Sequence, residues 1–225
     1  MIELSGVSYS YGDRRLFSDI TLSLQPGSFH FLTGPSGTGK TTLLKLCYLE
    51  LSPEVGDIRI FGDDADALDR DSVAKVRQRI GIVHQDCQFL NHLSVAENIA
   101  LPLRVAGTKP PNEQDNLREL MAWVGLSAHA TAHPPQLSGG ERQRAALARA
   151  VMMAPDMILA DEPTGNVDWE MSTRLLGLLV ELNRMGKTVL IATHDLNLIR
   201  QAKAQVQARV LRIRDGKLQL AGSDL

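Results

Sequence analysis

Residues 34–41 read GPSGTGKT, and this segment constrains the fold more than any other because it fits the pattern G-x-x-x-x-G-K-[ST]. The apolar run Phe29–Thr33 precedes it, as expected of a buried strand, and residues 41–49 follow with helical character. Glycines in such a loop let backbone N–H groups surround phosphate oxygens, and the N-terminus of the next helix adds partial positive charge. The segment therefore predicts a strand, a phosphate-binding loop and a helix in succession.

Two polar side chains end this loop, and two acidic ones follow a strand further along the chain. Lys40 is predicted to reach the β- and γ-phosphates of a nucleotide, and the Thr41 hydroxyl is predicted to bind Mg²⁺. The buried-strand pattern at residues 157–160 ends in Asp161 and Glu162, at the edge where α/β sheets bind ligands. Asp161 is therefore predicted to hold Mg²⁺, and Glu162 to be the general base that orients and polarises the attacking water.

Strand-like and helix-like segments alternate along most of the chain, which predicts an α/β fold with a parallel sheet. The predicted strands are residues 2–9, 20–24, 29–33, 57–61, 80–84, 157–160 and 188–192, with a hairpin at 206–213 and 217–220. The predicted helices outside the insert are residues 41–49, 71–79 and 169–184. Between residues 87 and 153 only helical patterns occur, at 94–103, 113–124 and 138–153, which predicts a helical insert.

Residues 137–141 read LSGGE and open the last of these helices. Ser138 as N-cap and Glu141 three residues later form a capping-box pattern. The two glycines between them weaken a helix by about 1 kcal/mol each relative to alanine. Bare backbone at a helix N-terminus is explained if a phosphate must approach it very closely.

Together with the phosphate loop and the acidic pair, this segment makes the chain resemble the ATP-binding cassette (ABC) ATPases over essentially its full length. Residues 137–141 resemble the signature motif of that family, and residues 34–41 and 157–162 resemble its Walker A and Walker B motifs. The resemblance implies a P-loop NTPase (RecA-like) core with an N-terminal antiparallel β subdomain and a helical signature subdomain. It implies one nucleotide-binding domain, with the core and β subdomain in residues 1–86 and 154–225 and the helical subdomain in residues 87–153.

The resemblance also implies further site residues. Tyr11 would stack on adenine, Gln85 would touch Mg²⁺ and sense the γ-phosphate, and His194 would contact the γ-phosphate, while residues 166–168 would lie where protomers meet. The predicted catalytic residues are Glu162 and His194, and the predicted Mg²⁺ ligands are Thr41, Gln85 and Asp161. The predicted ATP-binding residues are Tyr11, Gly34, Pro35, Ser36, Gly37, Thr38, Gly39, Lys40, Thr41, Thr42, Gln85, Asp161, Ser138, Gly139 and Gly140.

The last three of these residues are expected to act on a second copy of the chain. The resemblance implies a homodimer in which two copies pack head to tail with two-fold symmetry. ATP bound to the Walker motifs of one protomer would be covered by Ser138, Gly139 and Gly140 of the other. ATP binding would close the dimer and hydrolysis would open it.

Within the family, residues 29–37, 45–48 and 101–107 resemble the FtsE group of bacterial cell-division ATPases. His30, which precedes the phosphate loop, carries most of this preference, whereas residues 159–166 are also similar to LolD-type lipoprotein-release ATPases and related exporters. The first resemblance implies an FtsX-like polytopic membrane partner, received in a groove near residues 88–93, and control of cell-wall hydrolysis during division. The alternative is the ATPase of a lipoprotein-release (LolCDE-like) or MacB-type exporter.

Three histidines need separate interpretation. His84 stands where these ATPases usually carry phenylalanine, and a titrating side chain there predicts that coupling depends on pH. His129 and His133 are four residues apart, but Pro134 and Pro135 would end any helix there and no third ligand is near. We therefore expect no metal site at these two histidines.

Composition bears on the remaining classes. A formal net charge of −2 lacks the basic excess of a nucleic-acid-binding protein, so no nucleic-acid partner is expected. A small-molecule kinase could share the phosphate loop, but such kinases have no Ser-Gly-Gly helix that acts on a second protomer, as residues 137–141 would. The isolated Cys47 and Cys87, and apolar runs shorter than the roughly 20 residues of a spanning helix, favour a cytoplasmic protein. The resemblance places it peripherally on the inner face of the bacterial plasma membrane.

Overall fold

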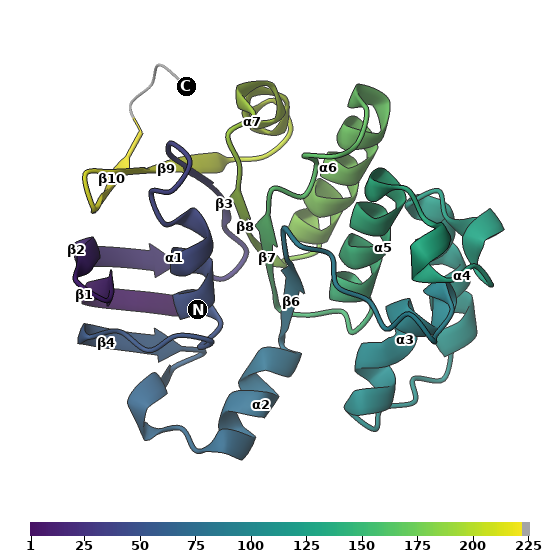
Figure 1. The fold of residues 1–225 in the computed structure, drawn as a ribbon, viewed down its shortest axis with the longest axis horizontal. Helices are drawn as coiled ribbons and strands as arrows, with labels where there is room; N and C mark the ends of the chain where they lie inside the picture. Colours follow the sequence, from purple (N-terminus) through teal and green to yellow (C-terminus); the bar gives the residue numbers. More distant parts are fainter. Residues whose placement is uncertain (222–225) are drawn as a thin grey trace.

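The computed structural model describes residues 1–221, which form two β-sheets with helices between and around them (Figure 1). The first sheet has four strands in the order β2-β1-β4-β5, and all its pairs are antiparallel. Its strands are β1 (Ile2–Tyr11), β2 (Arg14–Leu24), β4 (Val55–Ile60) and β5 (Asp63–Asp64). Apolar side chains alternate along β1 and β2, so this sheet buries one face.

The second sheet has six strands in the order β10-β9-β3-β8-β7-β6. Its first five members along the chain pair in parallel, and β10 adds an antiparallel edge to β9. Its strands are β3 (Phe29–Thr33), β6 (Ile80–Val83), β7 (Met157–Asp161), β8 (Thr188–Ala192), β9 (Ala208–Arg214) and β10 (Lys217–Leu220). The central strands β3, β7 and β8 are buried at every position because helices or the other sheet cover both faces.

Helix α1 (Lys40–Cys47) lies between the two sheets (Figure 1). Its Leu43 and Leu46 are fully buried in one cluster with Ile2 and Ile60 of the antiparallel sheet and Leu159 of the parallel sheet. The phosphate loop at the start of α1 is therefore held by both sheets.

The opposite face of the parallel sheet is covered by the remaining long helices. They are α3 (Val95–Val105), α4 (Glu113–Trp123), α5 (Gly139–Val151), α6 (Trp169–Arg184) and α7 (Leu196–Lys203). Side chains of these helices form the second core cluster with Phe31, Ile158 and Ile191 of the sheet. Helix α2 (Arg70–Gln78) leads from the antiparallel sheet to β6 (Figure 1).

The predicted alternation agrees with this arrangement, and β3 and α6 have the predicted bounds. Residues 87–153 contain helices and no strand, although the division of the chain into subdomains stays a prediction. Strand β2 begins six residues before the predicted residue 20, because its exposed first residues pair with β1 without an apolar pattern. Helix α7 was missed, although Asp195 caps it by accepting from the N–H groups of Asn197 and Leu198.

Candidate nucleotide site

The phosphate loop joins β3 to α1 and depends on glycine at the helix N-cap. Gly39 has a φ of +99°, and a Cβ added there would lie 2.6 Å from the Phe17 ring. An L-residue would therefore be strained in its backbone and would collide with a buried aromatic side chain. The sequence pattern requires glycine at this position because the turn into α1 leaves no space for a side chain.

Lys40 lies across the loop that precedes it. Its ammonium Nζ donates to the carbonyl oxygens of Gly34 at 2.8 Å and Pro35 at 3.4 Å. The Thr38 hydroxyl also donates to the Pro35 carbonyl, at 2.8 Å. The cationic head of Lys40 thus stands at the concave side of a glycine-rich turn, where an anionic phosphate group is favoured.

Thr41 and Asp161 connect α1 to the end of β7. The Thr41 hydroxyl donates to Oδ2 of Asp161 at 2.5 Å, and only 4% of Asp161 is exposed. Burial raises the pKa of the Asp161 carboxyl; the bond from Thr41 opposes that rise, and the charge of Glu162 adds to it. A bound cation would relieve the buried charge, and a hydroxyl beside a carboxylate is a donor set that Mg²⁺ accepts.

Glu162 is held at both its backbone and its side chain. It has a φ of +48°, and its N–H donates to the Ala192 carbonyl at 2.8 Å. Its Oε2 accepts from the Thr193 hydroxyl at 3.0 Å, and its Oε1 lies 2.8 Å from Nδ1 of His194. The carboxylate therefore has a defined orientation between the ends of β7 and β8.

These groups surround one cavity of about 470 Å³, a size typical of small-ligand sites. The lining residues are Tyr11, Arg14, Leu16, Ser36, Gly37, Gly39, Lys40, Thr41, Thr42, Gln85, Asp161, Glu162 and His194. Tyr11 is 52% exposed, its hydroxyl lies 3.4 Å from the hydroxyl of Thr42, and its ring meets Tyr9 edge to face. The structure thus gathers most of the predicted Walker residues with Tyr11, Gln85 and His194, whose roles toward a nucleotide stay predictions. Gly34, Pro35 and Thr38 of the predicted set do not line the cavity, and the carbonyls of Gly34 and Pro35 accept from Lys40 instead.

Two further residues of the cavity were missed by the sequence interpretation. Arg14 pairs with Tyr11 across the β1–β2 turn, and Leu16 follows it on β2. A strand assignment that reached back to Arg14 would have placed both beside Tyr11. The missing signal was the pairing itself, since polar residues at a hairpin end have no apolar alternation.

Ser138, Gly139 and Gly140 do not line this cavity. They line a separate depression with residues 166–168, so one chain does not bring its signature segment to its own phosphate loop. Ser138 caps α5, and the predicted capping box with Glu141 is present.

The two glycines of this segment differ in their packing. A Cβ on Gly140 would lie 2.8 Å from the Asn166 carbonyl oxygen, whereas one on Gly139 would make only an ordinary contact at 4.0 Å. Packing within the chain therefore explains Gly140 and leaves Gly139 open to a ligand.

His84, His129 and His133 have local partners. The His84 ring meets the Tyr48 ring edge to face at 5.8 Å, and partial burial lowers the pKa of its imidazole. His129 Nε2 lies 3.2 Å from Oε1 of Glu141, whereas His133 Nδ1 lies 3.3 Å from the Asn91 carbonyl. Within the described chain, no three His, Cys, Asp or Glu side chains gather as a protein-only metal site requires.

No helix among residues 1–221 has both the length and the apolar character needed to span a membrane.

Comparison with known proteins bears on the identity of this site. Residues 17–165 match the family described as ABC transporter. The chain is 43% identical over 203 residues to the cell division ATP-binding protein FtsE of Haemophilus influenzae, covering 89% of this chain and 93% of that protein. It is also 37% identical to the macrolide export ATP-binding/permease protein MacB of Marinobacter nauticus, but covers only 34% of that protein.

A solved structure extends the comparison to three dimensions. A dimeric ATP-binding cassette in a post-hydrolysis state, bound to ADP and Pi, superposes with a TM-score of 0.88 at 33% identity and 97% coverage of both chains. This likeness confirms the predicted P-loop cassette fold. Because the family match covers well over half of the chain, the resemblance drawn from its motifs is also confirmed. The chain belongs to the ABC transporter family, and it is an ATP-hydrolysing cassette of the ABC type.

Proposed function

We propose that this chain is the ATPase subunit of a membrane complex that acts in bacterial cell division, with an FtsX-like polytopic protein as partner. The observation that carries the proposal is the 43% identity with FtsE over nearly the whole of both chains. In this role the chain lies peripherally on the inner face of the plasma membrane, and ATP-driven closure bends the partner to control cell-wall hydrolysis.

The geometry of the cavity supports a division of labour among its residues during hydrolysis. Lys40 and the loop N–H groups bind the phosphates, and Tyr11 provides an aromatic surface at the rim for the base. Glu162 orients the attacking water and accepts its proton, while Thr193 and His194 hold that carboxylate in place. Thr41, Asp161 and Gln85 would hold Mg²⁺, which supplies charge neutralisation at the phosphates when bound.

The position of the signature segment supports a head-to-tail dimer. Ser138 and Gly139 are exposed and lie apart from the cavity of their own chain. A second copy can bring them to the nucleotide, and Gly139 has no packing reason within its chain to lack a side chain. The solved relative with ADP and Pi is itself a dimer.

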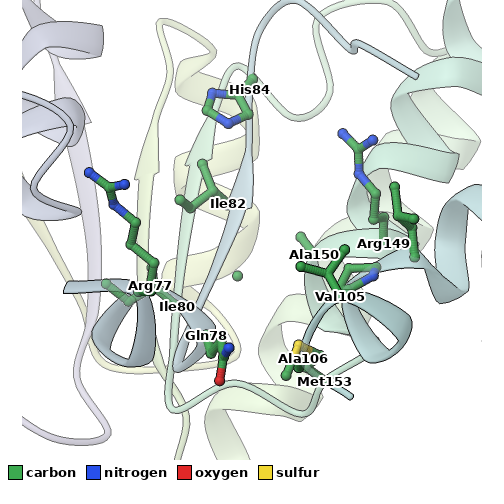
Figure 2. Close-up of a pocket in the computed structure, with 14 residues that line it drawn as sticks. Arg77, Gln78, Ile80, Ile82, His84, Val105, Ala106, Arg149, Ala150 and Met153 are labelled. Atoms are coloured by element: carbon green, nitrogen blue, oxygen red, sulfur yellow. The ribbon is translucent and has the colours of Figure 1, made fainter. Parts of the chain in front are cut away.

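A groove of about 500 Å³ supports the proposal that the chain binds a membrane partner (Figure 2). Figure 2 shows Arg77 of α2, side chains of β6 and His84, which follows β6, on one wall of the groove. Val105 of α3 and Arg149 of α5 lie on the other wall. Val105 is 78% exposed, and the lining is mainly apolar between two arginines. Such a groove suits an amphipathic partner segment with apolar and acidic side chains.

This groove lies beside the segment that the sequence interpretation favoured. Its lining includes none of residues 88–93, although Arg149 donates to the Gln88 carbonyl at 2.7 Å and so joins the two. The difference arises because α5 packs against β6 and α3 packs against α5, which leaves the opening between α3 and β6. The alternative exporter function uses the same chemistry and the same groove with a different partner.

The test is co-purification from detergent-solubilised membranes, with a tagged Glu162→Gln variant held in its ATP state. A small polytopic protein with one short outer domain supports the division role, whereas a larger protein with an extended periplasmic domain moves the assignment to export. Adding Val105→Glu should release the partner without loss of nucleotide binding. Met185→Glu is the matched control, since Met185 is 74% exposed at the end of α6, outside the groove.

A further inference from the structure

Gln143 is a buried polar side chain that the predicted site does not include. It lies one turn into α5 and is only 2% exposed. Its Nε2 donates to the carbonyl oxygen of Glu162, and its Oε1 accepts from the N–H of Asn166 at 3.0 Å. Both the N–H donor and the oxygen acceptor of this amide therefore form hydrogen bonds, and both bonds go to the backbone of the loop that follows β7.

That loop needs an external support. Glu162 has left the sheet ladder with a φ of +48°, a conformation that costs a non-glycine residue free energy. Its carbonyl otherwise accepts only a 3.2 Å bond from the N–H of Gly165, inside the same turn. The Glu162 carbonyl and the Asn166 N–H meet Gln143 in part-buried surroundings, where the loss of a hydrogen-bond partner is unfavourable, so Gln143 stabilises this backbone geometry.

Helix α5 also holds two other parts of the molecule. Its first turn presents Ser138 and Gly139, which the proposed dimer places on the partner's nucleotide. Its last turns carry Arg149, which donates to the Gln88 carbonyl and lies 4.7 Å above the Phe89 ring centre. A Cβ on Gly81 of β6 would lie 2.3 Å from the Ala150 carbonyl oxygen, so α5 packs directly on that strand.

From this geometry we infer that Gln143 is a positioning residue for ATP hydrolysis. It fixes the orientation of the Glu162 peptide group and couples the position of that group to the position of α5. A shift of α5, caused by nucleotide at the signature segment or by a partner in the groove, then moves the Glu162 carboxylate relative to the attacking water. This inference rests on the proposed function, because it assigns the regulation of the same site.

The test compares Gln143→Leu and Gln143→Glu with wild type. Leucine has a similar size and removes both hydrogen bonds, whereas glutamate keeps the acceptor for Asn166 and loses the donor to Glu162 unless it is protonated. Gln201→Leu is the matched control, since it removes a glutamine that bonds Thr173 between α6 and α7. The measurements are kcat and KM for ATP, ATP affinity of the isolated protein, and thermal unfolding.

We expect Gln143→Leu to lower kcat by about 10- to 100-fold, as small misplacements of catalytic groups do, with KM and ATP affinity within twofold of wild type. The activity of Gln143→Glu, divided by the activity of wild type at the same pH, should rise as the pH falls. The reason is that a protonated carboxyl regains a hydrogen-bond donor. The control should keep wild-type kinetics.

Activity of Gln143→Leu within twofold of the control overturns the inference. If that variant unfolds, a Gln143→Glu ratio that does not change with pH overturns it instead. These failures differ from failure of the proposed function, which would appear as a wild-type protein that neither hydrolyses ATP nor captures a membrane partner.

Discussion

Oε1 of Glu162 and Nδ1 of His194 lie 2.8 Å apart, although 32 positions separate the two residues in the chain. The contact exists because β7 and β8 are parallel neighbours, so the residues after each strand emerge at the same edge of the sheet. Thr193, from the same β8 end, bonds the other carboxylate oxygen. Glu162 is thus oriented by neighbouring side chains of its own chain.

Glu162→Gln should keep ATP binding and lose hydrolysis. Removal of a general base typically costs about 10²- to 10⁴-fold in rate, while Lys40 and the phosphate loop are untouched. The dimer should therefore persist with ATP, and gel filtration with ATP should show it. A variant that stays monomeric with ATP would contradict closure by nucleotide, and wild type with ADP is the reference for the open state.

Lys40→Ala should abolish tight nucleotide binding. The ammonium stands at the concave face of the loop and donates to the carbonyls of Gly34 and Pro35. Among residues 1–221, Arg14 is the one other lysine or arginine that lines the cavity. Titration with a fluorescent ATP analogue measures the loss. Lys45→Ala is the control on the same helix, since Lys45 pairs with Glu50 outside the cavity, and wild-type affinity for Lys40→Ala would refute the assigned role.

Gly139→Ala and Gly140→Ala should separate two reasons for glycine. A methyl group on Gly140 meets the Asn166 carbonyl at 2.8 Å, so this variant should lower the melting temperature of the isolated chain. A methyl group on Gly139 has room, and alanine favours the helix, so this variant should unfold at or above the wild-type temperature. It should nevertheless weaken ATP-dependent dimerisation; equal dimerisation would argue against phosphate contact at Gly139.

His30 should make the free energy of unfolding depend on pH. It is 3% exposed on β3, and its Nδ1 has no hydrogen-bond partner within the described part of the chain. Burial, with the charge of Arg209, lowers the pKa of its imidazole to about 4. The unfolded chain binds a proton near pH 6.5 and the folded chain does not, so stability is lost as pH falls below 6.5.

That loss should reach about 2 kcal/mol between pH 7.5 and pH 5, because the slope approaches about 1.4 kcal/mol per pH unit only as the pH falls well below 6.5. His30→Leu, which places an apolar group beside Leu190 on β8, should flatten this dependence in urea titrations at the two pH values. His92→Leu, at an exposed site, is the control. An unchanged pH dependence in His30→Leu would show that other groups cause it.

Much of the site was predictable because its chemistry lies in contiguous segments. The phosphate loop must follow a strand and precede a helix, and Asp161 must follow a buried strand, so local patterns locate both. The capping box of Ser138 and Glu141 was predictable for the same reason, since N-cap and N3 are three residues apart.

What sequence alone determined was therefore the set of candidate groups: a loop suited to phosphate, oxygen atoms suited to Mg²⁺, a candidate base and a signature helix. Only the tertiary structure decided which of these groups meet. It separated Ser138 from the cavity of its own chain, it explained Gly140 by the Asn166 carbonyl, and it used Gln143 to hold the loop after Glu162. The physical reason is that these relations depend on strand order and on how α5 packs on the sheet, and local hydrophobic patterns do not encode the partners of a buried polar group.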